Sequence, residues 1–292
     1  MPIEGDGGVV VFRLVAADID GTLLGPGGDI GPRTYGVVEE LRAAGVVLAL
    51  ATSRRFTGTA PVAQALGLSG PLIVYDGAQT RAYPGGEILA EQALAPEVAT
   101  AAAAILAAHR LRPIVQYADT AGEYLRVGPP DARNSHVSSY LARFANQASV
   151  HALGDLCSLD ASPLRVAAFG PWRRLRRAAG ALEVLPCGVQ LLRAGGYGAA
   201  ELTVFSPAAS KGAALLDLAS KLGIAVHETF ALGDGVNDIS MLRAAGMSVA
   251  MAHADKRTRA AARAGAAAGE DAATVISRVV LAGHLELTRD VV

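Results

Sequence analysis

Residues 12–24 read FRLVAADIDGTLL. Apart from Arg13, the first six are apolar, and Leu14–Ala17 form an uninterrupted apolar run, which predicts a strand buried on both faces of a parallel sheet. Asp18 and Asp20 follow it, and side chains two residues apart in an extended segment point the same way. We therefore expect both carboxylates to project from the carboxyl end of the strand, where open α/β sheets place their ligands. Two anionic groups this close repel each other unless a cation or a proton lies between them.

The chain up to residue 78 continues as an alternation of strands and helices. The expected elements are strands at 46–51 and 72–75 and helices at 32–44 and 61–66. Polar residues follow each strand, with Thr52-Ser53-Arg54 after the second and Asp76-Gly77-Ala78 after the third. Strands and helices at this spacing predict βαβ architecture with polar side chains gathered at the strand ends.

Between residues 83 and 199 the pattern changes to short strands mixed with helices. The expected elements are strands at 114–117, 123–127, 164–169 and 188–193 and helices at 96–109, 135–144 and 172–183. The earlier pattern then returns, with an extended segment at 201–205, a helix that opens at Ser210-Lys211-Gly212, and strands at 229–232 and 248–251. We therefore predict a discontinuous parallel-sheet core of residues 1–82 and 200–292, with an α+β domain inserted at 83–199.

The composition indicates a globular chain, since 51% of the residues are hydrophobic and 18% are charged. The alanine-rich stretch at 98–108 is too short and too weakly apolar to span a bilayer, so we expect no membrane partner. Residues 1–8, MPIEGDGG, lack the basic and apolar regions of a signal peptide, which favours a cytoplasmic location. The net charge of −1 argues against nucleic acid as a partner.

The one basic tract lies in the expected helix at 172–183. Its four arginines are Arg173, Arg174, Arg176 and Arg177. Two interpretations stay open for them, a solvated helix face or a surface that contacts an anion.

Four polar clusters lie at expected strand ends or at a helix start. They are Asp18/Asp20, Thr52/Ser53, Lys211 and Asp234/Asn237/Asp238. Carboxylates gathered beside one lysine need a hard divalent cation, and Mg²⁺ combines a few carboxylate ligands with waters and a bridging phosphate oxygen. Hydroxyls, backbone N–H groups and the lysine ammonium suit the other phosphate oxygens. One aspartate can attack phosphorus and form an aspartyl-phosphate, while a second carboxyl group acts as general acid and base.

Four motifs occur in a fixed order: D-x-D-G-T-L-L at 18–24, T-x-R at 52–54, S-K-G at 210–212 and G-D-G-x-N-D at 233–238. In this order they resemble the motifs of the haloacid dehalogenase (HAD) superfamily of phosphatases. The large insert between the second and third motifs resembles the Cof-like branch, subfamily IIB. The resemblance covers nearly the whole chain and implies a Rossmann-like α/β core of parallel strands with an inserted α+β cap domain.

The resemblance also implies roles for individual residues. Asp18 would be the nucleophile and Asp20 the general acid and base, and Lys211 would pair with both the phosphate and Asp18. The residues expected to bind the phosphoryl group are Thr52, Ser53, Arg54 and Asn237. The residues expected to hold Mg²⁺ are Asp18, Asp20 through its backbone carbonyl, Asp234 and Asp238.

Three positions depart from the usual pattern of that superfamily. Ser53 stands where glycine is usual, and Asp76 and His253 stand where asparagine is usual. None is an expected nucleophile, acid, lysine or metal carboxylate, so we expect the chemistry to be kept and the substrate preference to be affected.

The sequence thus predicts a Mg²⁺-dependent phosphomonoesterase that acts on a small soluble phosphate ester, a sugar phosphate in the first place, as a monomer or homodimer. Two alternatives stay open, a phosphomutase of the same superfamily and a phospho-ligand-binding protein without turnover. The Asp18/Asp20 pair argues against the second, because binding alone needs no general acid.

Overall fold

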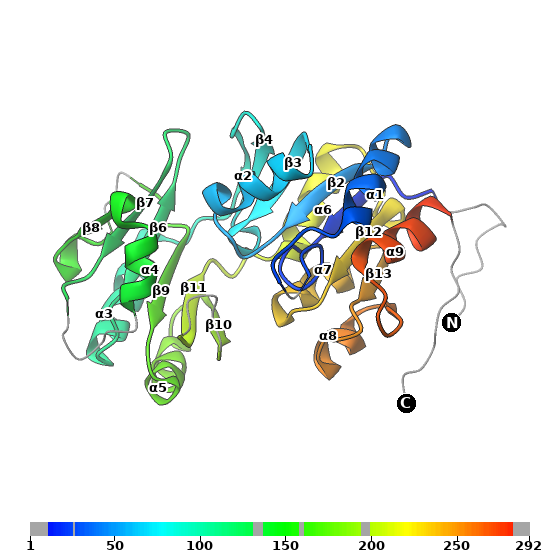
Figure 1. Cartoon of the computed structure of the whole chain (residues 1–292). Coiled ribbons are helices and arrows are strands. Elements are labelled where there is room, and N and C mark those ends of the chain that lie inside the picture. Colours follow the sequence, from blue (N-terminus) through cyan, green and yellow to red (C-terminus); the bar gives the residue numbers. More distant parts are fainter. Residues whose placement is uncertain (1–10, 26, 131–136, 158–160, 194–198, 283–292) are drawn as a thin grey trace. The chain divides into compact units, whose positions relative to one another are not determined.

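The computed structural model describes residues 11–25, 27–130, 137–157, 161–193 and 199–282. The chain divides into two compact units (Figure 1). The first, Met1–Leu89 with Ser210–Val292, is called the core unit below, and the second, Ala90–Ala209, is called the insert unit.

The core unit is built on a sheet with the strand order β14-β13-β12-β1-β2-β3-β4-β5. The strands are β1 (Leu14–Ala17), β2 (Val47–Ala51), β3 (Gly70–Val74), β4 (Gln79–Tyr83), β5 (Ile88–Glu91), β12 (Thr229–Gly233), β13 (Met247–Ala250) and β14 (Ala264–Gly265). β1 lies inside the sheet and pairs in parallel with β12 on one side and β2 on the other. All pairs from β14 to β3 are parallel, and β4 joins β3 antiparallel. The predicted parallel-sheet core is therefore confirmed.

Helices of the core unit bury the strands that carry the motifs. The helices are α1 (Pro32–Ala43), α2 (Phe56–Ala65), α6 (Lys211–Lys221), α7 (Ile239–Ala244), α8 (Lys256–Ala261) and α9 (Ala272–Ile276). Leu14 of β1 packs in one cluster with Leu215 of α6 and Met241 of α7. Its neighbour Val15, which the strand's alternation points to the opposite face, is also fully buried. This two-sided burial explains why residues 14–17 are all apolar.

The insert unit has its own sheet, with the order β10-β11-β9-β6-β7-β8. Its elements are α3 (Pro96–Ala108), β6 (Ile114–Ala118), β7 (Glu123–Val127), α4 (Ser138–Arg143), β8 (Ala148–Val150), β9 (Arg165–Phe169), α5 (Trp172–Leu182), β10 (Gly188–Leu192) and β11 (Glu201–Phe205). Leu106 of α3 and Leu175 of α5 share a buried cluster with Val115 of β6. Tyr140 of α4 packs with Ile114, the neighbour of Val115, in a separate cluster. The α3–α5 pair and α4 therefore cover opposite faces of this sheet.

The unit boundaries at 89/90 and 209/210 differ from the 82/83 and 199/200 that the sequence suggests. Residues 83–89 stay with the core unit because β4 and β5 extend its sheet. Residues 201–205, expected to resume the core, form β11 and pair antiparallel with β9 and β10 in the insert sheet. A strand's own residues do not tell which sheet it joins, because both sheets offer apolar neighbours.

Three smaller differences concern element bounds. The helix expected at 61–66 begins at Phe56 and holds Pro61 inside it, since the Arg55 carbonyl accepts N–H groups from Gly58 and Thr59 and starts the first turn earlier. The strand expected to be last is β13, and short elements follow it. The helix expected at 135–144 appears as α4, and residues 135–136 lie outside the described residues. Over the described part of the chain, no helix has both the length and the apolarity to cross a membrane.

The turn after β3 gives the first testable prediction. Gly77 has a φ of +91°, and a Cβ there would lie 2.2 Å from the carbonyl oxygen of Ser210. Because the Ser210 carbonyl belongs to the backbone and cannot rotate away from the new Cβ, Gly77→Ala should lower the free energy of unfolding by at least about 2 kcal/mol. The control Gly67→Ala has a φ of +60° with nothing within 4 Å of its Cβ, so it should cost only about 1 kcal/mol. Urea unfolding of both variants measures this, and equal losses would contradict it.

Candidate active site

The predicted polar residues gather at one edge of the core sheet. Asp18 directly follows β1, Thr52 directly follows β2 and Asp234 directly follows β12. These three strands are neighbours and run parallel, so their carboxyl ends meet at the same edge. Lys211 is the first residue of α6, and the Ser210 hydroxyl caps that helix by accepting the Ala213 N–H at 3.0 Å.

Lys211 connects two of the carboxylates. Its side chain is fully buried, and Nζ donates to Oδ1 of Asp18 and to Oδ1 of Asp238, both at 2.6 Å. The second oxygen of Asp238 accepts the backbone N–H groups of Asp234 and Gly235 at 3.0 and 2.8 Å. Asp238 therefore holds the turn after β12 and the lysine at the same time.

The electrostatics of this pair follow from its burial. Burial raises the pKa of Asp18 to about 8, a shift that Lys211 opposes and the neighbouring Asp238 increases. Burial alone would lower the pKa of Lys211, but Asp18 and Asp238 beside the ammonium outweigh it and raise that pKa. The lysine is therefore a permanent cation, and further positive charge beside Asp18 would favour its ionised form.

A third carboxylate completes a group that fits a divalent cation. Oxygen atoms of Asp18, Asp234 and Asp238 all lie within 4.8 Å of one another. Oδ1 of Asp234 accepts the Thr22 hydroxyl at 3.0 Å, and its Oδ2 lies 3.3 Å from Nε2 of His253. Burial raises the pKa of Asp234 even though the Thr22 hydrogen bond opposes the shift. Carboxylate oxygens gathered this closely are the hard ligands that suit Mg²⁺, so the donor set fits that ion.

Gly21 brings the turn after β1 close to Asp234. Its φ is +83°, and a Cβ at this position would lie 2.5 Å from Oδ2 of Asp234. Any larger residue would displace the carboxylate, so this approach requires glycine. The Asp-Gly-Thr segment after Ile19 thus builds the site as well as the turn.

Asp20 and Arg54 form a separate ion pair. Arg54 donates from Nε to Oδ2 of Asp20 at 2.7 Å and from Nη2 to Oδ1 at 2.5 Å. The Asp20 side chain is 56% exposed, whereas Asp18 is buried. The two aspartates were expected to project together, but β1 ends at Ala17, so the alternation of an extended strand does not govern them. The Asp20 carboxylate lies outside the three-carboxylate group.

The remaining predicted residues lie in the turns after β2 and β12. Thr52 is fully buried, its hydroxyl accepts the Arg54 N–H at 3.1 Å, and its carbonyl accepts the Asp76 N–H at 3.0 Å. Ser53 is half-buried between Thr52 and Arg54 in the chain. Asn237 donates from Nδ2 to Oδ1 of Asp76 at 3.0 Å.

Sequence reasoning missed how three residues contribute. Asp76 and His253 were singled out as departures from a pattern without contacts, and Thr22 was included only as a member of the motif at 18–24. Asp76 adopts the left-handed conformation, with a φ of +56°, and the Asp-Gly pair at 76–77 was its only signal in the sequence. The contacts of Thr22 and His253 with Asp234 cross the sheet edge, so no local pattern marks them.

Comparisons with known proteins identify the family and the fold. The family model for haloacid dehalogenase-like hydrolases matches residues 15–275. The HMP-PP phosphatase of Serratia proteamaculans is 30% identical over 257 residues, which cover 84% of this chain and 85% of that protein. The pyridoxal phosphate phosphatase of Escherichia coli is 28% identical over 268 residues, covering 85% and 90%. A solved phosphatase of the haloalkanoate (HAD) enzyme superfamily from Bacteroides thetaiotaomicron shares the fold, with a TM-score of 0.74, 17% identity and coverage of 94% and 97%.

The two ends of α6 offer a matched pair of lysines. Lys211→Met should leave the buried Asp18 and Asp238 without their cation and lower the free energy of unfolding by about 3–5 kcal/mol. Lys221 forms an exposed i,i+4 pair with Asp217, so Lys221→Met should cost less than about 1 kcal/mol. Urea unfolding in EDTA compares the two variants with the unsubstituted protein. A Lys211 variant as stable as the Lys221 variant would show that the buried lysine is not needed for the fold.

Proposed function

The chain belongs to the haloacid dehalogenase-like hydrolase family, and from this premise we propose that it is a Mg²⁺-dependent phosphatase that works through an aspartyl-phosphate. The observation that carries the proposal is the buried Asp18 carboxylate, held by Lys211 at 2.6 Å beside Asp234 and Asp238. A strand-end carboxylate between an ammonium and a cation site is placed for attack on a phosphoryl group.

Asp18 is the proposed nucleophile. Lys211 holds Oδ1, so Oδ2 is the oxygen that attacks phosphorus. The bond from phosphorus to the ester oxygen breaks as the bond to Oδ2 forms, and the leaving oxygen takes a proton. Water then attacks the aspartyl-phosphate, which releases inorganic phosphate and restores the carboxylate. The Lys211 ammonium stabilises the negative charge on the transferring group in both steps.

Asp20 is the proposed general acid and base. Its exposure places it where a leaving group can reach it, and Arg54 fixes both of its oxygens. For proton transfer, one oxygen must turn to the ester. We therefore assign Arg54 two successive partners, Asp20 before substrate binds and the substrate phosphate afterwards, because a guanidinium fork fits either anion.

Asp18, Asp234 and the backbone carbonyl of Asp20 are the proposed Mg²⁺ ligands. Asp238 is the remaining proposed carboxylate of the metal site; because its oxygens already accept Lys211 and two backbone N–H groups, we assign it a contact with the ion through water. When bound, Mg²⁺ supplies positive charge to the oxygens of the phosphoryl group. Thr52, Ser53 and Asn237 are the proposed additional contacts of that group.

The proposed substrate is a small soluble phosphate ester. The sequence resemblance suggests sugar phosphates, and two relatives are named as phosphatases of HMP-PP and of pyridoxal phosphate. These three kinds of compound are therefore the first candidate substrates to test. The cytoplasmic location, the monomeric or homodimeric state and the absence of nucleic-acid and membrane partners stay predictions of the sequence.

Hydrolysis of p-nitrophenyl phosphate tests the mechanism. Turnover should require Mg²⁺ and stop in EDTA. Asp18→Asn should lower kcat by roughly 10⁴ or more, and Asp20→Asn by about 10²–10⁴. The control Asp217→Asn changes an exposed aspartate on α6 and should keep full activity. Full activity in Asp18→Asn would refute the mechanism. Transfer of phosphate to a sugar instead of water would identify a phosphomutase, and phosphate-ester binding without turnover across the panel would identify a binding protein.

Metal binding can be measured without catalysis. Mg²⁺ at about 100 times its dissociation constant should add about 2.7 kcal/mol to the free energy of unfolding. Asp234→Asn should remove most of this gain because it removes a ligand charge, whereas Asp217→Asn should keep it. Thermal unfolding with Mg²⁺ and with EDTA gives both values, and an equal gain in the Asp234 variant would exclude Asp234 as a ligand.

A further inference from the structure

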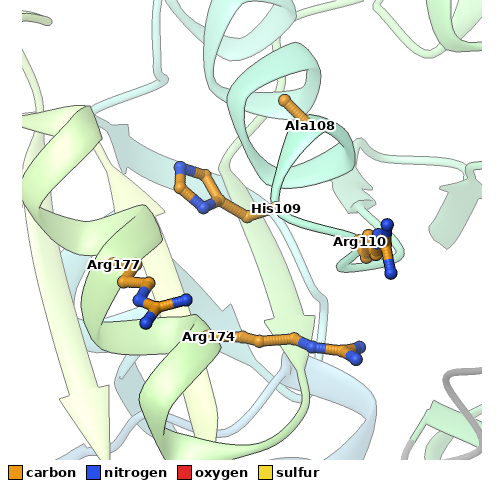
Figure 2. Close-up of a pocket in the computed structure, with 5 residues that line it drawn as sticks. All are labelled: Ala108, His109, Arg110, Arg174 and Arg177. Carbon is orange, nitrogen blue, oxygen red and sulfur yellow. The ribbon is translucent and has the colours of Figure 1, made fainter.

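A small hollow in the insert unit is lined mainly by arginine side chains. It lies between the end of α3 and the first half of α5, and its volume is about 240 Å³. Its lining residues are Ala108, His109, Arg110, Arg174 and Arg177. Figure 2 shows His109 and Arg110 at the end of α3 and Arg174 and Arg177 along the neighbouring α5. The whole hollow therefore belongs to one unit.

Among the described residues, no acidic side chain lines the hollow. Its lining contains three guanidinium groups and one imidazole but no carboxylate. Within the described ranges, no ion pair is formed by Arg110, Arg174 or Arg177. Nη1 of Arg174 is buried and has no hydrogen-bond partner among the described residues. Buried donors in folded proteins are nearly always satisfied, so this N–H group indicates a missing acceptor.

The backbone also favours an anion at this place. Arg174 and Arg177 are three residues apart on α5 and share one helix face. α5 begins after Pro171 with no side-chain cap and no acidic residue in its first turn. Arginines near a helix N-terminus are unfavourable with the helix dipole, and a bound anion would compensate both the dipole and the side chains. Arg110, which lines the same hollow, has a left-handed backbone conformation with a φ of +57°.

We propose that this hollow binds the phosphoryl oxyanion of a small ligand, either free phosphate or an organic phosphate. A tetrahedral dianion presents acceptor oxygens in several directions. It can therefore accept hydrogen bonds from Arg174 and Arg177 on α5 and from Arg110, which follows α3. The volume lies below the range of pockets for drug-sized ligands, which suits a phosphoryl group with few further atoms. The site lies outside the proposed catalytic residues, and its existence does not depend on their function.

Two pairs of arginines on α5 make a matched test. Isothermal titration with inorganic phosphate in EDTA, at constant ionic strength, should show saturable binding at millimolar concentrations. Arg174→Ala/Arg177→Ala should weaken it at least about tenfold, since two charge-assisted contacts are lost. The control Arg173→Ala/Arg176→Ala removes the same charge from the same helix outside the hollow, so its affinity should stay within about twofold of the original. Trp172, the only tryptophan of the chain, lies on α5 and gives a local fluorescence signal of the same binding.

Further measurements identify the source of the phosphoryl group and control for misfolding of the variants. Glycerol 3-phosphate binding more tightly than inorganic phosphate would indicate an organic phosphate, and the reverse order would indicate free phosphate. Arg110→Gly places glycine where φ is positive, so it should fold while weakening binding. Circular dichroism and p-nitrophenyl phosphate hydrolysis check that each variant is folded. Absence of saturable binding, or equal weakening by both arginine pairs, would overturn the proposal.

Discussion

The ammonium of Lys211, buried between Asp18 and Asp238, is the interaction on which the core unit's site depends. Asp18 follows β1, Asp238 closes the turn after β12, and Lys211 opens α6, so one cation fixes three elements. A buried ammonium is tolerated only where anions surround it, and buried carboxylates equally need a cation. None of the three groups could be placed without the others.

This arrangement leaves a charge that the protein itself does not balance. Three clustered carboxylates stand against one buried ammonium, which leaves two negative charges when all are ionised. Burial raises the pKa values of Asp18 and Asp234, and the neighbouring Asp238 carboxylate adds to both shifts. A divalent cation would carry the compensating charge, and this is the physical reason for proposing a Mg²⁺-dependent reaction at this edge of the sheet. The hollow of the insert unit carries the opposite imbalance, with cations in excess.

Most of the fold and the members of the site could be predicted, because strand ends and motif residues are local features. The parallel strands up to β3 and the residues after them are where the sequence places them. Pairing was harder: the ion pair of Arg54 with Asp20 was not predicted, and His253 was given no partner but approaches Asp234. These pairs join distant segments, so only the folded chain brings them together. The assignment of residues 201–205 to the core was wrong for the same reason, because β11 pairs with β9 and β10, and its own residues do not show these partners.

Asp76 shows how one departure from a family pattern keeps the structure and changes the charge. A carboxylate only accepts hydrogen bonds, so its contact with Nδ2 fixes the Asn237 amide with its NH₂ group toward Asp76. An aspartate also tolerates the left-handed conformation that this turn requires, so the backbone is not disturbed. What changes is electrostatic: Asp76 adds a negative charge that favours the charged form of Lys211. Any effect of this residue on substrate preference therefore acts through charge at the site and not through its shape.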